Sequence, residues 1–160
     1  MAGIEPFRFV PEGQSLQGAA FSRSFKAITL AVVAGSGLTL VNLLLDGKFG
    51  GASLSDSLRA AGWFVLGWGL LAWTAWHVFK SRICIDTQGL HQTWLWDKHM
   101  AYDDLAYVKL IRVRGLEWLM APRLYARTLV GKFAVFYVSD AAALHACERL
   151  SAELKRFRQM

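Results

Sequence analysis

Residues 27–45 read AITLAVVAGSGLTLVNLLL, and residues 60–79 read AAGWFVLGWGLLAWTAWHVF. Neither stretch contains an Asp, Glu, Lys or Arg. At a helical rise of about 1.5 Å per residue, each is long enough to cross a hydrocarbon core of about 30 Å. The sequence therefore predicts two membrane-spanning helices, 27–45 and 60–79, within a segment of residues 27–80.

The residues between the two spans, 46–57, are rich in Gly and Ser and predict the loop of a helical hairpin. Basic residues are unevenly placed around this hairpin, with six beside its outer ends and two between the spans. The six are Arg8, Arg23, Lys26, Lys80, Arg82 and Lys98, and the two are Lys48 and Arg59. The positive-inside bias predicts a multi-pass protein of the bacterial inner membrane with both termini in the cytoplasm.

Composition supports a membrane protein with a basic polar domain. The 160 residues are 54% hydrophobic, include seven tryptophans and carry a net charge of +6. Residues 80–160 hold thirteen Lys/Arg and eight Asp/Glu, so most of the positive charge lies there. Basic charge beside a membrane favours anionic lipid headgroups, and no motif indicates nucleic-acid binding.

After Arg82 the pattern changes to short β-like runs separated by turn signals, which predicts a β-meander. The expected strands are 83–86, 90–96, 106–113, 124–129 and 133–138. A helix is expected at 141–156, with Leu150 and Leu154 buried against the sheet. Residues 81–160 are thus predicted to form one cytoplasmic domain. Residues 1–26 are interpreted as a cytoplasmic tail, in which the alternation of Phe7 and Phe9 leaves open a short strand or a docked segment.

Three short motifs in this domain are the hairpin Ile85-Asp86-Thr87-Gln88-Gly89-Leu90, the Asp104-Leu105 step, and Val138-Ser139-Asp140 before the last helix. With the strand and helix order, they make residues 81–158 similar to the bacterial pleckstrin-homology-like (PH-like) domain. The resemblance implies a partly open β-barrel with a C-terminal α-helix, behind a membrane α-helical hairpin. Members that bind inositol phosphates carry cations in the first hairpin loop, whereas residues 86–89 here have none.

Small residues indicate where the spans pack closely. Gly62 and Gly69 lie seven residues apart on one face of the second span, and Ala31 and Gly35 form a small-xxx-small pair in the first. Such residues let helix backbones approach each other, either within the hairpin or against another protein.

A second candidate surface combines cations with a short apolar loop. It comprises Arg112, Arg114, Trp118, Leu119, Met120, Arg123, Arg127 and Lys132. Arg112 and Arg114 are expected on one face of a strand. Two interpretations stay open: a solvated barrel rim, or a patch that faces the membrane or a partner.

No catalytic motif, metal-ligand spacing or cofactor signature is present in the sequence, so we expect neither an enzyme nor a bound cofactor or metal. His77 is interpreted as an interfacial residue because the first span offers no second axial ligand. The function expected is a non-catalytic accessory or scaffold protein that packs against a larger inner-membrane complex. The alternative is a membrane-anchored module that senses or handles lipid headgroups.

Overall fold

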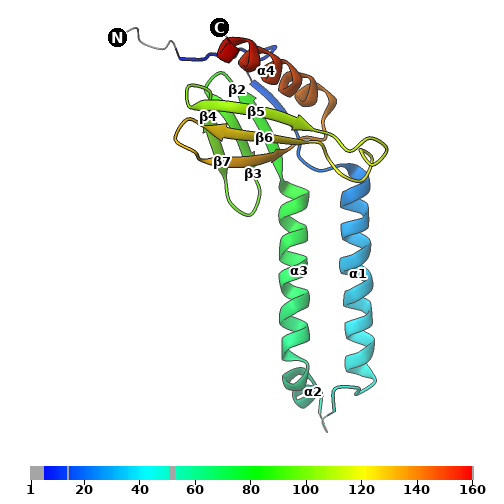
Figure 1. The fold of residues 1–160 in the computed structure, drawn as a ribbon. Coiled ribbons are helices and arrows are strands. Elements are labelled where there is room, and N and C mark those ends of the chain that lie inside the picture. Colours follow the sequence, from blue (N-terminus) through cyan, green and yellow to red (C-terminus); the bar gives the residue numbers. More distant parts are fainter. Residues whose placement is uncertain (1–5, 14, 51–52, 160) are drawn as a thin grey trace. The chain divides into compact units, whose positions relative to one another are not determined.

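The computed structural model describes residues 6–13, 15–50 and 53–159. These residues form seven strands and four helices, drawn in Figure 1. In chain order they are β1 (Ser15–Ala19), α1 (Arg23–Leu45), α2 (Leu54–Ala60), α3 (Gly62–Lys80), β2 (Arg82–Asp86), β3 (Gly89–Thr93), β4 (Lys98–Ala101), β5 (Leu105–Ile111), β6 (Arg123–Thr128), β7 (Phe133–Tyr137) and α4 (Ala141–Gln159).

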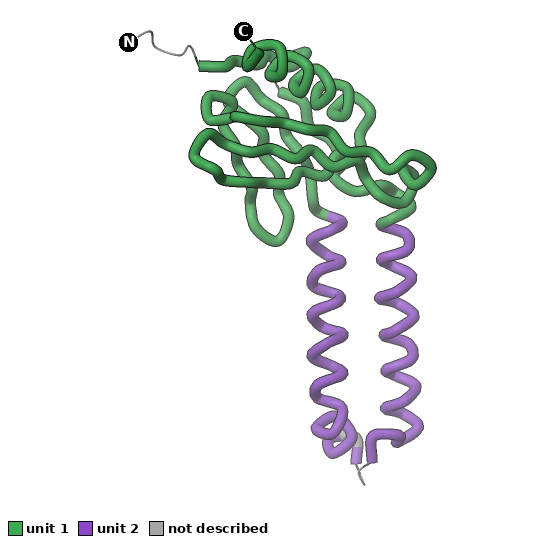
Figure 2. Tube along the Cα trace, viewed as in Figure 1, with its two compact units in different colours: residues 1–25, 80–160 green, residues 26–79 purple. Residues whose placement is uncertain are grey.

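The chain divides into two compact units, coloured in Figure 2. Residues 1–25 and 80–160 form the first, here called the β unit, and residues 26–79 form the second, the helical unit. The helical unit is therefore inserted into the chain of the β unit, between β1 and β2.

The β unit contains two antiparallel sheets with the strand orders β1-β2-β3-β4 and β5-β6-β7. The five strands expected from sequence are present with shifted ends, and β1 and β4 are additional. Lys98 and His99 read as turn residues, yet they begin β4 and pair with β3. A four-residue strand with one buried side chain, Met100, is too short for its alternation to be recognised.

Helix α4 packs on the sheets through one apolar stripe. The carboxylate of Asp140 caps it by accepting hydrogen bonds from the backbone N–H groups of Ala142 and Ala143, both at 3.1 Å. Leu150 and Leu154 are fully buried, which confirms the sequence expectation. The close approach also explains Gly18 of β1, where an added Cβ would lie 2.6 Å from the Cβ of Asp140.

The segment before β1 belongs to the core of the β unit. Phe7 and Phe9 are buried, and their rings contact Phe157 and Tyr102 at centroid distances of 5.4 and 5.7 Å. The sequence left open whether the segment with Phe7 and Phe9 forms a short strand or docks on the rest of the protein. In the structure it docks on the core, and the first strand begins only at Ser15. This corrects the assignment of residues 1–26 to a separate tail, because β1 pairs with β2 from Ser15–Asp86 to Ala19–Arg82.

In the helical unit, α1 and α3 contact each other at two levels, and the segment after α1 contacts α3 at a third. Lys26 donates to the carbonyl of Phe79 at 3.3 Å, Trp68 donates through Nε1 to the carbonyl of Val33 at 3.0 Å, and Phe49 lies 5.3 Å from Phe64. These pairs show that the helices run antiparallel. The expected loop at 46–57 also contains the start of the short helix α2, which Ser53 caps.

One helix in the described part of the chain, α1, is long and apolar enough to cross a membrane. The second expected span, 60–79, does not meet the same criterion, although α3 covers most of it. Four tryptophans and His77 lower its mean hydropathy, because indole and imidazole rings carry polar N–H groups. The second span therefore stays a prediction.

The docking of the N-terminal segment predicts a test of the core. Phe9 is 1% exposed and Val10 is 67% exposed. We expect Phe9→Ala to lower the free energy of unfolding by about 3–5 kcal/mol, because it leaves a cavity. Chemical denaturation of the full chain in detergent micelles, followed by tryptophan fluorescence, measures this. The adjacent Val10→Ala is the control, and equal losses in the two variants would contradict the docked arrangement.

Candidate interaction surface

The sheet β5-β6-β7 has one buried face and one open face. Val108, Leu124 and Phe136 point into the core, and the residues between them point outward. A bulge between Leu105 and Tyr107 turns Tyr107 outward while Leu105 stays buried. The open face, here called the outer sheet face, consists of Tyr107, Lys109, Ile111, Arg123, Tyr125, Arg127, Phe133, Val135 and Tyr137.

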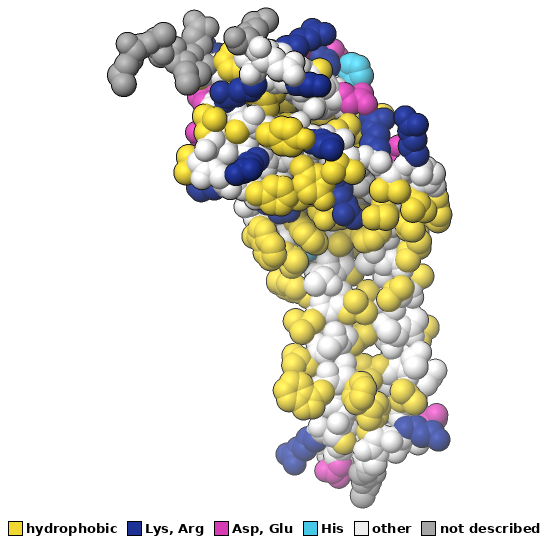
Figure 3. Space-filling model, viewed as in Figure 1, with side chains coloured by type: hydrophobic (Ala, Val, Ile, Leu, Met, Phe, Trp, Pro, Cys, Tyr) yellow, Lys and Arg dark blue, Asp and Glu magenta, His cyan; other side chains and the backbone are white. Residues whose placement is uncertain are grey.

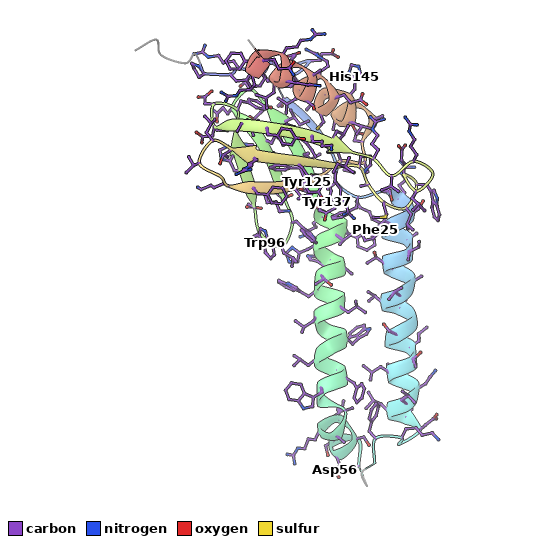
Figure 4. The ribbon with its side chains drawn as sticks, in the orientation of Figure 1. Phe25, Asp56, Trp96, Tyr125, Tyr137 and His145 are labelled. Carbon is purple, nitrogen blue, oxygen red and sulfur yellow. The ribbon has the colours of Figure 1, made fainter. Side chains whose placement is uncertain are left out.

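Strand register arranges the outer sheet face in three rows. Arg127 lies between Tyr107 and Phe133, and the other rows are Lys109-Tyr125-Val135 and Ile111-Arg123-Tyr137. Tyr107 and Phe133 are 54% and 60% exposed. Figure 3 shows hydrophobic side chains interleaved with Lys and Arg over these strands, and Figure 4 shows Tyr125 and Tyr137 on the same face. None of the nine residues is acidic, so the face is both aromatic and positively charged.

An aromatic cluster forms within the β unit around Phe21. Phe21 stacks on Phe25 at 5.4 Å and on Tyr137 at 5.2 Å, and it contacts Trp94 at 5.9 Å. Lys98 lies 5.4 Å from the Trp94 ring, and burial lowers the pKa of its ammonium group. We call this group, with Arg123 at 5.6 Å from the Tyr137 ring, the aromatic collar.

The aromatic collar is chemically suited to the edge of a bilayer. Phe25 stands two residues before the apolar run that starts at Ala27, so it belongs to the end of α1 that adjoins the β unit. Aromatic rings with nearby cations are enriched at the headgroup level of membranes. A small cavity of about 90 Å³ is lined by Phe25, Leu119 and Met120 of this region, among other residues.

The cations expected to form one patch are divided in the structure. Arg123 and Arg127 lie on the outer sheet face, and Lys132 lies in the adjoining β6-β7 turn. Strand β5 ends at Ile111, so Arg112 and Arg114 do not share a strand face, contrary to expectation. Instead Arg112 forms an ion pair with Glu148 of α4.

The apolar part of the predicted patch is divided as well. Trp118 is exposed in the β5-β6 loop, whereas Leu119 and Met120 are half-buried beside the aromatic collar. Sequence reasoning missed Tyr107, Lys109 and Tyr125. Their signal is the alternation of aromatic and basic residues with period two along β5 and β6.

Three of the four small residues predicted to mediate helix packing, all of them glycines, border open space in the described part of the hairpin. A Cβ added at Gly35, Gly62 or Gly69 would meet nothing within 4 Å, and Ala31 is exposed. The close approach occurs at Gly37, where an added Cβ would lie 2.9 Å from Nε1 of Trp68. The open faces therefore remain available for contacts outside this chain.

An apolar groove lies within the helical unit. Its volume is about 720 Å³, and side chains of α1, α3 and the intervening segment line it, including Leu40, Phe64 and Leu71. Ser36 and Thr39 add hydroxyl groups, which bond to carbonyls of their own helix at Val32 and Gly35. The two helices alone thus leave apolar surface uncovered.

The buried ionisable groups of the β unit are held in neutral forms. Burial raises the pKa of the Cys147 thiol to about 12, with a smaller contribution from Glu148. Burial also raises the pKa of the Tyr102 phenol and of the Cys84 thiol. Neutral thiols are poor nucleophiles. Among the described residues, no group of three or more His, Cys, Asp or Glu side chains could hold a metal ion.

No family model matches the chain, and no curated protein and no solved structure is significantly similar to it.

The Gly37 contact predicts a difference between two neighbouring glycines. Gly37→Leu should displace the Trp68 indole and break its bond to Val33, lowering the stability of the hairpin by about 1–3 kcal/mol. Gly35→Leu should have little effect, because nothing lies within 4 Å of its added Cβ. Thermal unfolding in detergent compares the two. Equal destabilisation would show that Trp68 does not pack on Gly37.

The raised pKa of Cys147 predicts a loss of stability in alkali. Its folded-state pKa of about 12 exceeds the ordinary 9.0, so the stabilisation is complete below pH 9.0 and is lost as pH rises toward 12. We expect the urea midpoint of the full chain to fall across this range, and to fall less in Cys147→Ala. An identical pH dependence in both proteins would disprove the contribution of Cys147.

Proposed function

We propose that this chain is a non-catalytic accessory protein of the bacterial inner membrane. In this proposal two helices anchor it, both termini face the cytoplasm, and a PH-like domain docks on an acidic surface of a larger membrane complex. The observation that carries the proposal is the outer sheet face, with its exposed aromatic rings, its three cations and its lack of carboxylates.

The pairing of β1 with β2 supports a second span. These strands precede α1 and follow α3, and they must meet on the same side of the membrane. If α1 crosses the bilayer, the chain must therefore cross back before Arg82. Helix α3 has 19 residues, enough at about 1.5 Å each for a core of about 30 Å, whereas α2 has only 7.

The strand order supports the PH-like assignment. Within residues 81–158, to which the resemblance applies, six strands in antiparallel pairings precede one C-terminal helix, and β1 (Ser15–Ala19) adds a strand from outside that range. The first hairpin of the resemblance, residues 85–90, is the β2-β3 hairpin, and its loop contains no Lys or Arg. A headgroup site of the inositol-phosphate type in that loop is therefore not part of the proposal.

The chemistry of the outer sheet face favours a protein partner. Interface centres are enriched in Tyr, Phe and Arg, which bury large rigid surfaces and form directed hydrogen bonds. The row Tyr107-Arg127-Phe133 places an arginine between two exposed rings. An acidic residue of a partner could pair with Arg127 while apolar side chains cover the rings. The open groove beside Leu40 and Phe64 offers the same partner a contact inside the membrane.

The aromatic collar favours the second candidate, a module that senses or handles lipid headgroups. Lys98 and Arg123 lie against aromatic rings next to the start of α1. Cations at this level attract anionic phospholipids. In the first candidate the collar only seats the β unit at the bilayer surface, whereas in the second it is the functional site.

The accessory function is tested by charge reversal on the outer sheet face. We expect Arg127→Glu to reduce stoichiometric copurification with a membrane complex by at least about tenfold, since close interfacial charge pairs are coupled by about 1.5 kcal/mol or more. The measurement is the partner-to-bait ratio after extraction of native membranes in mild detergent. A photo-crosslinking residue in place of Phe133 should mark the partner that is lost.

Arg156→Glu makes the same charge change at an exposed position of α4 and serves as the control. It should leave the partner ratio unchanged. If Arg127→Glu also leaves the ratio unchanged, the docking proposal is wrong. If the protein copurifies only with anionic lipid, and Lys98→Gln removes that lipid, the second candidate function, a module that senses or handles lipid headgroups, replaces the docking proposal.

A further inference from the structure

A cavity of about 530 Å³ lies between β5 and the C-terminal half of α4. These two elements lie side by side in the β unit (Figure 1). Val108 and Leu154 contribute apolar surface to its lining, and Ser151 contributes a hydroxyl group. The volume is in the range of small-molecule sites, about 300–1,000 Å³.

The charged residues of the lining all have the same sign. Lys109 of β5 and Lys155 and Arg158 of α4 line the cavity, and none of its nine lining residues is acidic. The acidic side chain of α4 that could compensate them, Glu153, is instead within 3.4 Å of Arg149. Three cationic residues therefore line this cavity, and no carboxylate is among its lining residues.

Arg158 is held in place by the protein and still has an unused donor. Its Nη2 donates to the carbonyl of Leu105 at 2.7 Å, which fixes the guanidinium against the β5 edge. Among the described residues, its Nε is buried without a hydrogen-bond partner. A buried donor without a partner costs about 1–3 kcal/mol, more when it is charged, and because Nε is closed to solvent, a ligand reaches it only if the side chain shifts.

We propose that this cavity, here called the β5-α4 cavity, binds an organic phosphate. A phosphate monoester carries about −1.5 to −2 charges at neutral pH, which matches three cationic lining residues better than a single carboxylate does. Arg158 and Lys155 bind the phosphate oxygens, and the organic part of the ligand lies on Val108 and Leu154. The ligand is either a soluble phosphate monoester or the headgroup of an anionic phospholipid such as phosphatidylglycerol, a diester with one negative charge, and both present anionic phosphate oxygens.

This site does not depend on the proposed docking function. The residues tested for docking, Arg127 and Phe133, do not line the β5-α4 cavity, and the residues expected to bind the phosphate, Lys155 and Arg158, do not belong to the outer sheet face. Only Tyr107 and Lys109 belong to both. Failure of one proposal therefore leaves the other standing.

The test compares two adjacent residues of α4. Lys155 lines the β5-α4 cavity, whereas Arg156 is exposed and does not line it. The full chain is studied with glycerol 3-phosphate in detergent micelles, and in nanodiscs of phosphatidylcholine with or without phosphatidylglycerol. The readouts are calorimetric titration and the shift of Tm, at ionic strength matched with sodium chloride.

We expect saturable binding of one probe by the wild type, about tenfold weaker binding in Lys155→Gln, and unchanged binding in Arg156→Gln. If only phosphatidylglycerol raises Tm, with the same dependence on Lys155, the source is a lipid headgroup. If glycerol 3-phosphate binds, the source is soluble. The absence of saturable binding with both probes, or equal losses in the two variants, would overturn the proposal.

Discussion

The pairing of β1 with β2 is the constraint on which the rest of the structure depends. Paired strands lie about 4.8 Å apart, so the chain that leaves at Ala20 must return at Ser81, and the two residues are joined by a backbone hydrogen bond. The segment between these two residues therefore starts and ends at neighbouring positions of the β unit. This requirement explains the antiparallel contacts of α1 and α3. It also means that residues 81–160 alone would lack one strand of the first sheet and the buried rings of Phe7 and Phe9.

The same closure determines which surfaces remain for interaction. Helix α4 and the N-terminal segment cover the core, with Phe7 against Phe157 and Arg149 paired to Glu12. Among the described residues, no helix or strand covers the outer sheet face around Tyr107, Arg127 and Phe133, and there the chain places rings and a cation, whereas Tyr137 at the other end is contacted by Phe21 and Trp94. Alternation along a strand separates the residues that pack in the core from those that face outward, because each inward residue such as Leu124 is followed by an outward one such as Tyr125. Core stability and the proposed recognition can therefore change independently.

The helical unit shows a related division between internal and external contacts. Trp68 joins the helices by packing on Gly37 and bonding to Val33, while the faces that contain Gly35 and Gly69 stay open. Because lipid provides no hydrophobic drive between helices, a hairpin joined at few points is weakly held by itself. A partner inside the membrane, as proposed, would cover the groove beside Phe64.

The sequence by itself determined the apolar helix α1, most of the strands and the buried stripe of α4, because these depend on local composition and periodicity. It pointed to Arg123 and Arg127, which do lie together on one strand face. Only the tertiary structure decided that Ser15–Ala19 joins the sheet, that Arg112 turns to Glu148, and that Gly37 is the point of close helix approach. Each of these depends on a partner 31 to 71 positions away along the chain. Local patterns carry no information about such a partner until the chain has folded.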